Sequence, residues 1–499
     1  MEDKKDYLKC ESIFESYAIY SNIVNDFTWR KVTKKFTDKK ILKRGKLLVS
    51  FEKKSKTLQS CNFILYNDKL VEEEVFLNQD QSNFGQCKYL YLYFPFLKPV
   101  NIGNNHGFSL QSFGKVRNFF CETKSDQLEW IGVLKYSCLL NNVKMDYRFI
   151  KVLGSGAFSK VFLAEKIINK KHYAIKSLKK DAIFSKIKEF DSVINEIKIL
   201  RMLNHPHIIK LFECYESPHY VFLVMQYLEG GELYYQIKEK NKFHEKEAQS
   251  IIKGLIETIK YIHDENIIHR DLKPENIILK KKDDIMSFKI VDFGLSVYSR
   301  KDDSLIQRCG SPGYVAPEVL LKEGYTNKAD IFSIGIISYT LLTGLIPFQA
   351  VTYENLIELN KNGYLDYNNE KWNFVSNEAK SFVNMLTLKD PYKRYSADEA
   401  QKHPWISMKI KEEEEKSIKL NIECRMIQKD LNSVQDLSPK MEINDELKFN
   451  FQMAVQNEKK KLKLYDDIST TNPEMTSILN VMKINRPLII NPNQNLESL

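Results

Sequence analysis

The sequence predicts an α+β protein with two folded parts and a polar C-terminal tail. Between residues 41 and 121, short runs rich in β-branched and aromatic residues alternate with polar turns, and a segment with helical spacing follows. Three more short strands, YRFIKVLG, KVFLAEK and HYAIKSL, begin near Tyr147 and give way to mostly helical sequence as far as Trp405. Beyond that point aromatic residues become rare and charged runs such as KIKEEEEKSIK appear, which indicates a partly disordered tail.

Length and charge limit the classes of protein that the chain can belong to. It has 499 residues, enough for two to four domains at about 100–200 residues each. The net charge of +10, from 75 basic and 65 acidic residues, is mild for this length, so we expect no nucleic-acid partner. The start MEDKKDYLK lacks the apolar core of a signal peptide, and the eight cysteines form no Cys-x-x-Cys pair. We therefore expect a cytoplasmic protein, and we read the uncharged run Ile331–Phe348 as a buried helix.

We divide the chain into an N-terminal extension (1–40), a β-rich domain (41–140), a larger domain (147–406) and the tail (407–499). In the β-rich domain, SDQLEWIGVLKYSCLL places Leu128, Ile131 and Leu134 at helical spacing, with Ser125 as the expected N-cap. Many strands followed by one helix suggest a small barrel or sandwich that the helix closes.

The stretch GFSLQSFGKVRNFFCETKSDQLEWIGVL resembles the last strands and the C-terminal helix of a pleckstrin-homology (PH) domain, in which Trp130 would plug the barrel. Members of that family that bind phosphoinositides carry cations on their first two strands. The cations offered here are on the first strand and the loop after it, namely Lys43, Arg44, Lys46, Lys53, Lys54 and Lys56. The second strand, around Ser60–Phe63, offers none. Three roles stay open: phosphoinositide binding, which would recruit the protein to a membrane, docking to protein, and autoinhibition.

The loop VLGSGAFSKVFLAEK contains Gly-x-Gly, a spacing shared by several kinds of nucleotide site and by plain hairpins. A dinucleotide fold needs a helix directly after the glycines, whereas KVFLAEK alternates and reads as a strand. A Walker loop needs Gly-Lys-Ser/Thr, which is absent from this stretch. The remaining interpretation is a hairpin whose small residues let backbone N–H groups approach phosphates.

Residues downstream of the loop supply the other parts of a phosphoryl-transfer site. Lys176 can reach diphosphate oxygens and Glu196 can pair with it. HRDLKPENIIL and DFG supply Asp271 as a base, Lys273 to neutralise phosphate charge, and Asn276 and Asp292 as oxygen ligands for Mg²⁺.

This arrangement resembles the eukaryotic protein-kinase family over residues 147–406, and the resemblance implies the bilobal protein kinase fold, ATP and Mg²⁺ as cofactors, and Asp271, Lys273, Lys176 and Glu196 as catalytic residues. It also implies a Glu318–Arg394 ion pair and a bracing role for Asp330. The ATP contacts that it implies are Leu153, Gly154, Ser155, Gly156, Ala157, Phe158, Ser159, Lys160, Val161, Ala174, Lys176, Met225, Gln226, Leu228, Glu232 and Ile278.

Lys273 and the segment GSPGYVAPE match the serine/threonine branch, and the closest likeness is to the calcium/calmodulin-dependent group. Glu232 and Glu275 stand where relatives bind arginines of the substrate peptide, so we expect protein substrates with a basic residue before the Ser or Thr. Gln307 replaces a phosphorylatable residue, so activation at that position is not expected. The alternative function is an inactive pseudokinase scaffold, and it conflicts with the presence of Lys176, Asp271 and Asp292.

The tail segment KFNFQMAVQNEKKKLKL, Lys448–Leu464, is a poor match to a basic amphipathic helix, so we do not expect calmodulin as a partner.

Overall fold

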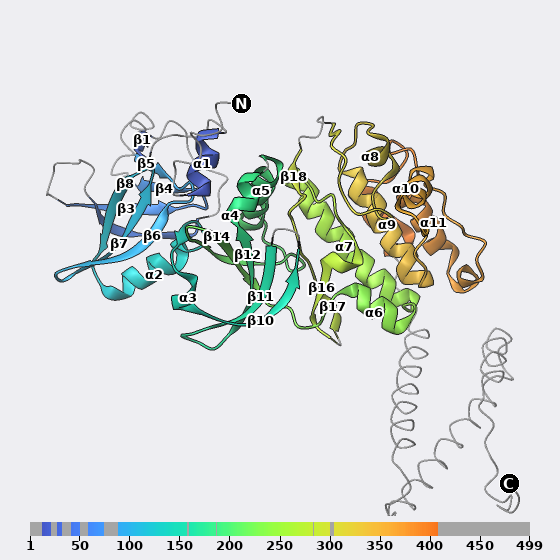
Figure 1. The fold of residues 1–499 in the computed structure, drawn as a ribbon, viewed down its shortest axis with the longest axis horizontal. Helices are drawn as coiled ribbons and strands as arrows, with labels where there is room; N and C mark the ends of the chain where they lie inside the picture. Colours follow the sequence, from blue (N-terminus) through green and yellow to red (C-terminus); the bar gives the residue numbers. More distant parts are fainter. Residues whose placement is uncertain are drawn as a thin grey trace, which may run out of the picture. The chain divides into compact units, whose positions relative to one another are not determined.

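The structure, a computed structural model, describes residues 12–20, 27–31, 41–49, 58–73, 88–156, 159–185, 187–282, 284–299 and 304–407. Within these ranges no helix combines the length and the apolar character that a bilayer span requires. The predicted tail and Lys53, Lys54 and Lys56 lie outside the described residues. Below, the described residues from 12 to 140 are called the N-terminal module, residues 147–226 the strand lobe and residues 233–407 the helical lobe (Figure 1).

Strands of the N-terminal module pair antiparallel in the order β1-β5-β4-β3-β2-β8-β7-β6. They are β1 (Trp29–Lys31), β2 (Lys43–Val49), β3 (Gln59–Leu65), β4 (Lys69–Glu73), β5 (Lys88–Tyr91), β6 (Phe96–Ile102), β7 (Asn105–Ser112) and β8 (Lys115–Cys121). Among the described residues, strands β2 and β8 share the pairs Leu48–Phe120 and Val49–Phe119, and this short contact joins two halves of the sheet. The inward side chains form one hydrophobic core that includes Phe63, Phe108 and Phe119.

Helix α2 (Lys124–Leu134) packs on this core, but its register differs from the predicted one. Its N-cap is Thr123, whose side chain accepts a hydrogen bond from the Asp126 amide at 3.1 Å, so Ser125 was the wrong N-cap. The buried face includes Trp130, and Leu128 is 60% exposed because it falls off that face. Trp130 is 1% exposed and lies against Gly45 of β2, where an added Cβ would be 3.3 Å from the indole.

The first forty residues, expected to be an extension, contribute two described elements. Helix α1 (Ile13–Tyr20) buries Ile13, Phe14 and Ala18 completely. Strand β1 pairs with β5 at the edge of the sheet.

The strand lobe continues the same sheet through β9 (Leu139–Leu140), in the order β9-β13-β14-β12-β11-β10. Helix α3 (Val143–Asp146) precedes the lobe, whose elements are β10 (Tyr147–Ser155), β11 (Ser159–Lys166), β12 (His172–Lys179), α4 (Lys180–Ser185), α5 (Ile187–Met202), β13 (Leu211–Glu216) and β14 (Tyr220–Gln226). Helix α5 lies against this sheet and contacts β13 and α1 (Figure 1).

The helical lobe is built around two long helices. Its helices are α6 (Leu233–Lys240), α7 (Glu245–Asp264), α8 (Pro317–Leu321), α9 (Lys328–Thr343), α10 (Tyr353–Asn362), α11 (Asn377–Leu386), α12 (Ala397–Lys402) and α13 (Pro404–Ser407), with 3₁₀ turns at Pro274–Asn276 and Glu370–Phe374. The short strands are β15 (Ile267–Ile268), β16 (Ile277–Lys281), β17 (Asp284–Ile290) and β18 (Val297–Tyr298). Every residue of α9 from Ala329 to Thr343 is buried, which confirms the prediction of a core helix there.

Candidate active site

A buried ion pair joins strand β12 to helix α5. Nζ of Lys176 lies 2.7 Å from Oε1 and 3.0 Å from Oε2 of Glu196. Burial by itself lowers the pKa of Lys176, but the carboxylates of Glu196 and Asp292 outweigh burial and raise the pKa above its ordinary value. Lys176 is therefore a fixed positive charge whose position depends on α5.

Two side chains with oxygen donors lie between the lobes. Asp292 has a left-handed backbone (φ 59°), and its Oδ1 is 3.6 Å from Nζ of Lys176. The amide nitrogen of Asn276 donates to the backbone oxygen and to Oδ2 of Asp271, at 2.8 and 3.0 Å. Because that nitrogen is committed, Oδ1 is the atom of Asn276 that can serve a cation. A carboxylate and an amide oxygen are hard donors of the kind that Mg²⁺ prefers, so these residues fit the ion that the sequence predicts.

Asp271 is held by three polar neighbours, one of which is the Asn276 side chain described above. Its Oδ1 accepts a hydrogen bond from Oγ of Ser311 at 2.7 Å, and its Oδ2 is 3.0 Å from Nζ of Lys273. Lys273 also donates to Oγ of Ser311 at 2.6 Å. The three side chains fix the carboxylate and place a cation beside it.

Asp330 braces the backbone just before Asp271. The carboxylate accepts from the amides of His269 and Arg270 at 2.9 and 2.8 Å, and from Nε2 of His263 at 2.9 Å. Burial alone raises the pKa of Asp330, but the His263 hydrogen bond and the charges around it outweigh burial and lower the pKa. Arg270 itself has a φ of 69°, a left-handed conformation that these bonds to its own segment help to maintain.

The glycine-containing loop is the turn of the β10–β11 hairpin. The register places Gly154 opposite Val161 and Ser155 opposite Lys160, and the Gly156 amide donates to the Ser159 carbonyl at 2.8 Å. Two predicted nucleotide contacts in this turn, at positions 157 and 158, lie outside the described residues.

The residues expected around the adenine come from separate strands. Val161 in β11, Ala174 in β12 and Ile278 in β16 are each partly exposed. Met225 stands opposite Ala174 in the sheet. Its neighbour Gln226 donates its amide to the Lys210 carbonyl at 3.0 Å, so the carbonyl is the hinge group that Gln226 can offer a base. The remaining predicted contacts in this region are Leu153, Leu228 and Lys160, of which Leu153 is 41% exposed.

Glu232 and Glu275 lie close enough to influence each other. Burial raises the pKa of Glu232, and the charge of Glu275 raises it further. Oε2 of Glu275 is buried and has no hydrogen-bond partner among the described residues.

Two arginines, Arg270 and Arg394, hold the segment that follows Asp292. Nη1 of Arg270 donates to Oε1 of Gln307 at 3.4 Å and to the Tyr325 hydroxyl at 3.1 Å. Further along, Arg394 forms a two-pronged ion pair with Glu318 at 2.6 and 2.9 Å.

Asn360 is a site residue that the sequence reasoning missed. Its Oδ1 accepts from the Gly313 amide and its Nδ2 donates to the Val315 carbonyl, each at 2.8 Å. It is fully buried and lies three residues after Ile357 on the buried face of α10. A polar residue on an otherwise apolar face is the signal that could have found it.

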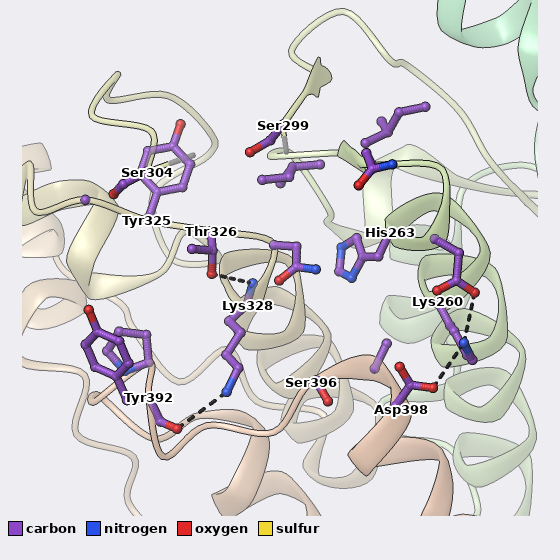
Figure 2. Close-up of a pocket in the computed structure, with 18 residues that line it drawn as sticks. Lys260, His263, Ser299, Ser304, Tyr325, Thr326, Lys328, Tyr392, Ser396 and Asp398 are labelled. Atoms are coloured by element: carbon purple, nitrogen blue, oxygen red, sulfur yellow. Dashed lines mark hydrogen bonds and ion pairs between the residues drawn. The ribbon is translucent and has the colours of Figure 1, made fainter. Parts of the chain in front are cut away.

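Figure 2 shows a cavity of about 580 Å³ in the helical lobe, which His263 and Tyr325 line together with residues outside the site described above. Lys260 forms ion pairs there with Asp264 and Asp398 at 2.8 and 3.0 Å, and Lys328 donates to the Tyr392 carbonyl at 3.4 Å. Since these charges compensate one another, we assign the cavity no ligand.

Comparison with known proteins agrees with this geometry. The family model "Protein kinase domain" matches residues 147–406. The chain is 42% identical over 270 residues to "Calcium/calmodulin-dependent protein kinase type 1" of Caenorhabditis briggsae, which covers 54% of this chain and 74% of that protein. It is 39% identical over 268 residues to "Myosin light chain kinase A" of Dictyostelium discoideum, covering 54% of this chain and 90% of that protein. The chain therefore belongs to the protein kinase family and is an ATP-dependent serine/threonine protein kinase.

Proposed function

We propose that Asp271 is the base that accepts the proton of the substrate hydroxyl. Contacts with Ser311 and Lys273 support this role, because they hold the carboxylate in one orientation. Lys273 then lies where it can neutralise charge on the transferred phosphate. Asn276 and Asp292 would hold Mg²⁺, which neutralises the phosphates of ATP when bound, and Lys176 would orient those phosphates. The pseudokinase alternative has no support, since none of these groups is missing.

The Gly154–Ser159 turn and the predicted adenine contacts would enclose the nucleotide. The register of β10 and β11 supports this assignment because it places Gly154 and Gly156 at the hairpin turn, where no side chain hinders the approach of phosphates to the backbone. At this turn the phosphates would be bound by backbone N–H groups, in addition to their contact with Lys176.

The substrate preference that we propose is a basic residue before the phosphorylated Ser or Thr. The observation that carries it is the buried Oε2 of Glu275, which has no hydrogen-bond partner among the described residues. A buried acceptor left unpaired is costly, and a substrate guanidinium would satisfy it. The charge of Glu275 also raises the pKa of Glu232, as expected for two carboxylates that would share one cation.

A positional-scanning peptide library tests this preference. The wild-type enzyme should select Arg or Lys upstream of the phosphoacceptor, and Glu275→Gln should weaken that selection by about tenfold. The control Glu257→Gln, an exposed acid on α7, should leave the selection unchanged. Selection of acidic or apolar residues by the wild type would contradict the proposal.

For the N-terminal module we propose a PH-like domain that docks to protein. The strand order β5-β4-β3-β2-β8-β7-β6 and the buried Trp130 of the closing helix support the PH-like assignment. Lys43 is 2.8 Å from Glu129 and Lys46 is 3.0 Å from Glu122, so these two first-strand lysines already have carboxylate partners. Partners of this kind compete with a phosphoinositide headgroup, which favours protein docking.

Liposome flotation of the full chain separates protein docking from lipid binding. If the module docks to protein, the fraction of protein that floats with phosphoinositide-containing vesicles should be the same for two proteins. These are the wild type and a variant that carries Lys53→Glu, Lys54→Glu and Lys56→Glu. Loss of vesicle binding in the variant would establish lipid binding and recruitment to a membrane instead.

We propose a cytoplasmic enzyme that acts without calmodulin, as the sequence predicts. The relatives named above include calcium/calmodulin-dependent protein kinase type 1, so calmodulin is the partner to test directly. Calcium-loaded calmodulin added to the full chain should change its activity less than twofold, and a larger stimulation would contradict the proposal.

A further inference from the structure

Strand β9 links the N-terminal module to the strand lobe. Leu139 pairs in parallel with Phe96 of β6 on one side and with Cys214 of β13 on the other. The two sheets therefore continue into each other, and the end of α5 lies beside this junction, where Arg201 donates to the Cys138 carbonyl.

Arg201, in the last turn of α5, binds the N-terminal module directly. Its guanidinium donates to the carbonyls of Ser137 and Cys138 at 3.1 and 2.9 Å, and lies 4.4 Å from the ring centroid of Phe94. One turn earlier, Nζ of Lys198 lies 5.4 Å from the ring centroid of Tyr93. The last turn of the helix is thus held by charge-assisted and cation–π contacts from outside the strand lobe.

A second attachment lies at the end of β13. Glu216, which is 3% exposed, accepts from the Ile13 amide and from Oγ of Ser12, each at 2.7 Å. The same carboxylate forms an ion pair with Lys180 at 2.6 Å. Helix α1 is thereby fixed to the lobe, and its apolar side chains join the core cluster that contains α5 residues Ile194 and Ile197.

Glu196 lies on the same helix, five residues before Arg201. Its contact with Lys176 exists only while α5 keeps its present orientation. We infer that Arg201 is a positioning residue for phosphoryl transfer: through it the N-terminal module holds α5 so that Glu196 can fix Lys176. The module therefore activates the kinase, in addition to the docking to a partner protein proposed above. This inference rests on the proposed role of Lys176.

The inference has a specific kinetic consequence. If release of Arg201 lets α5 leave its orientation, only the fraction of molecules with α5 in place can bind ATP phosphates through Lys176. The apparent affinity for ATP falls in proportion to that fraction. Saturating ATP shifts the population toward molecules with α5 in place, so kcat is retained. A purely structural role would instead reduce the amount of folded enzyme, which lowers kcat and leaves the KM for ATP unchanged.

The test uses the full chain with Arg201→Ala, Arg201→Lys, and Phe94→Ala, which alters only the N-terminal module. Arg201→Ala should raise the KM for ATP about tenfold and keep kcat within about twofold. Phe94→Ala should shift the KM in the same direction, and Arg201→Lys should give a smaller shift because it keeps a cation over the ring. Amides of residues 187–202 should exchange hydrogen faster in Arg201→Ala and regain protection with ATP.

Arg117→Ala is the matched control. In the wild type, the guanidinium of Arg117 makes the same kind of contact inside the N-terminal module. Its Nε and Nη2 donate to the Phe27 carbonyl at 3.2 and 3.0 Å, and the guanidinium lies 5.9 Å from the centroid of the Phe27 ring. This variant should leave the KM for ATP unchanged. An unchanged KM in Arg201→Ala, or an equal rise in Arg117→Ala, would overturn the inference. Failure of the Lys176 role would appear separately, as full activity in Lys176→Met.

Discussion

Arg270, the residue before the proposed base, donates from Nη1 to Oε1 of Gln307 at 3.4 Å. The hydroxyl of Tyr325 contacts the same guanidinium nitrogen at 3.1 Å and donates to the Gln307 carbonyl at 2.9 Å. Neutral groups thus occupy the place where a phosphate could otherwise pair with this arginine.

The first prediction concerns this arrangement. Full-length enzyme treated with phosphatase should keep its activity, because Gln307 and Tyr325 already hold Arg270. Mass spectrometry verifies dephosphorylation, and Ser304→Ala should be as active as wild type. Activity found only in Ser304-phosphorylated protein would contradict this prediction.

The ion pair between Glu318 and Arg394 should be a major source of stability. Both side chains are almost completely buried, at 2% and 0% exposure. Glu318→Gln leaves the guanidinium without its charged partner and should lower the free energy of unfolding by about 3–5 kcal/mol. Urea denaturation measures this change. Lys393→Gln, whose side chain is 77% exposed, is the control and should change the free energy of unfolding by less than about 1 kcal/mol.

Acid should weaken the brace at Asp330. Its pKa in the folded protein lies below the ordinary value of 3.8, so its stabilising contribution is complete above that value and is lost as pH falls. The free energy of unfolding of wild type should therefore drop more steeply than that of Asp330→Asn below about pH 4. Equal slopes for the two proteins would show that Asp330 contributes no such linkage.

Much of the site could be predicted because its residues stand in short local motifs. Asp271, Lys273 and Asn276 share one catalytic loop, and a fixed spacing along the chain leads to a fixed arrangement in space. Lys176 and Glu196 are twenty residues apart, and their pairing followed from opposite charge on a strand and a helix.

Other features could not be predicted from local pattern. Arg201 contacts backbone carbonyls 63 and 64 residues away. Every residue has a backbone carbonyl, so the sequence does not indicate which ones accept from this arginine. The N-cap of α2 was misplaced because Thr123 and Ser125 are both good caps, and the local sequence does not distinguish between them. Helix α1 is short, and its burial depends on contacts with Glu216, which is about two hundred residues away.

The most direct test of the central claim is phosphate transfer from ATP to a basic Ser/Thr peptide by wild type, Lys176→Met and Asp271→Asn. The account predicts activity in the wild type and a loss of about 100-fold or more in each variant. Circular dichroism should show that all three proteins are folded. Equal phosphate incorporation by all three would contradict the assignment of these residues to catalysis.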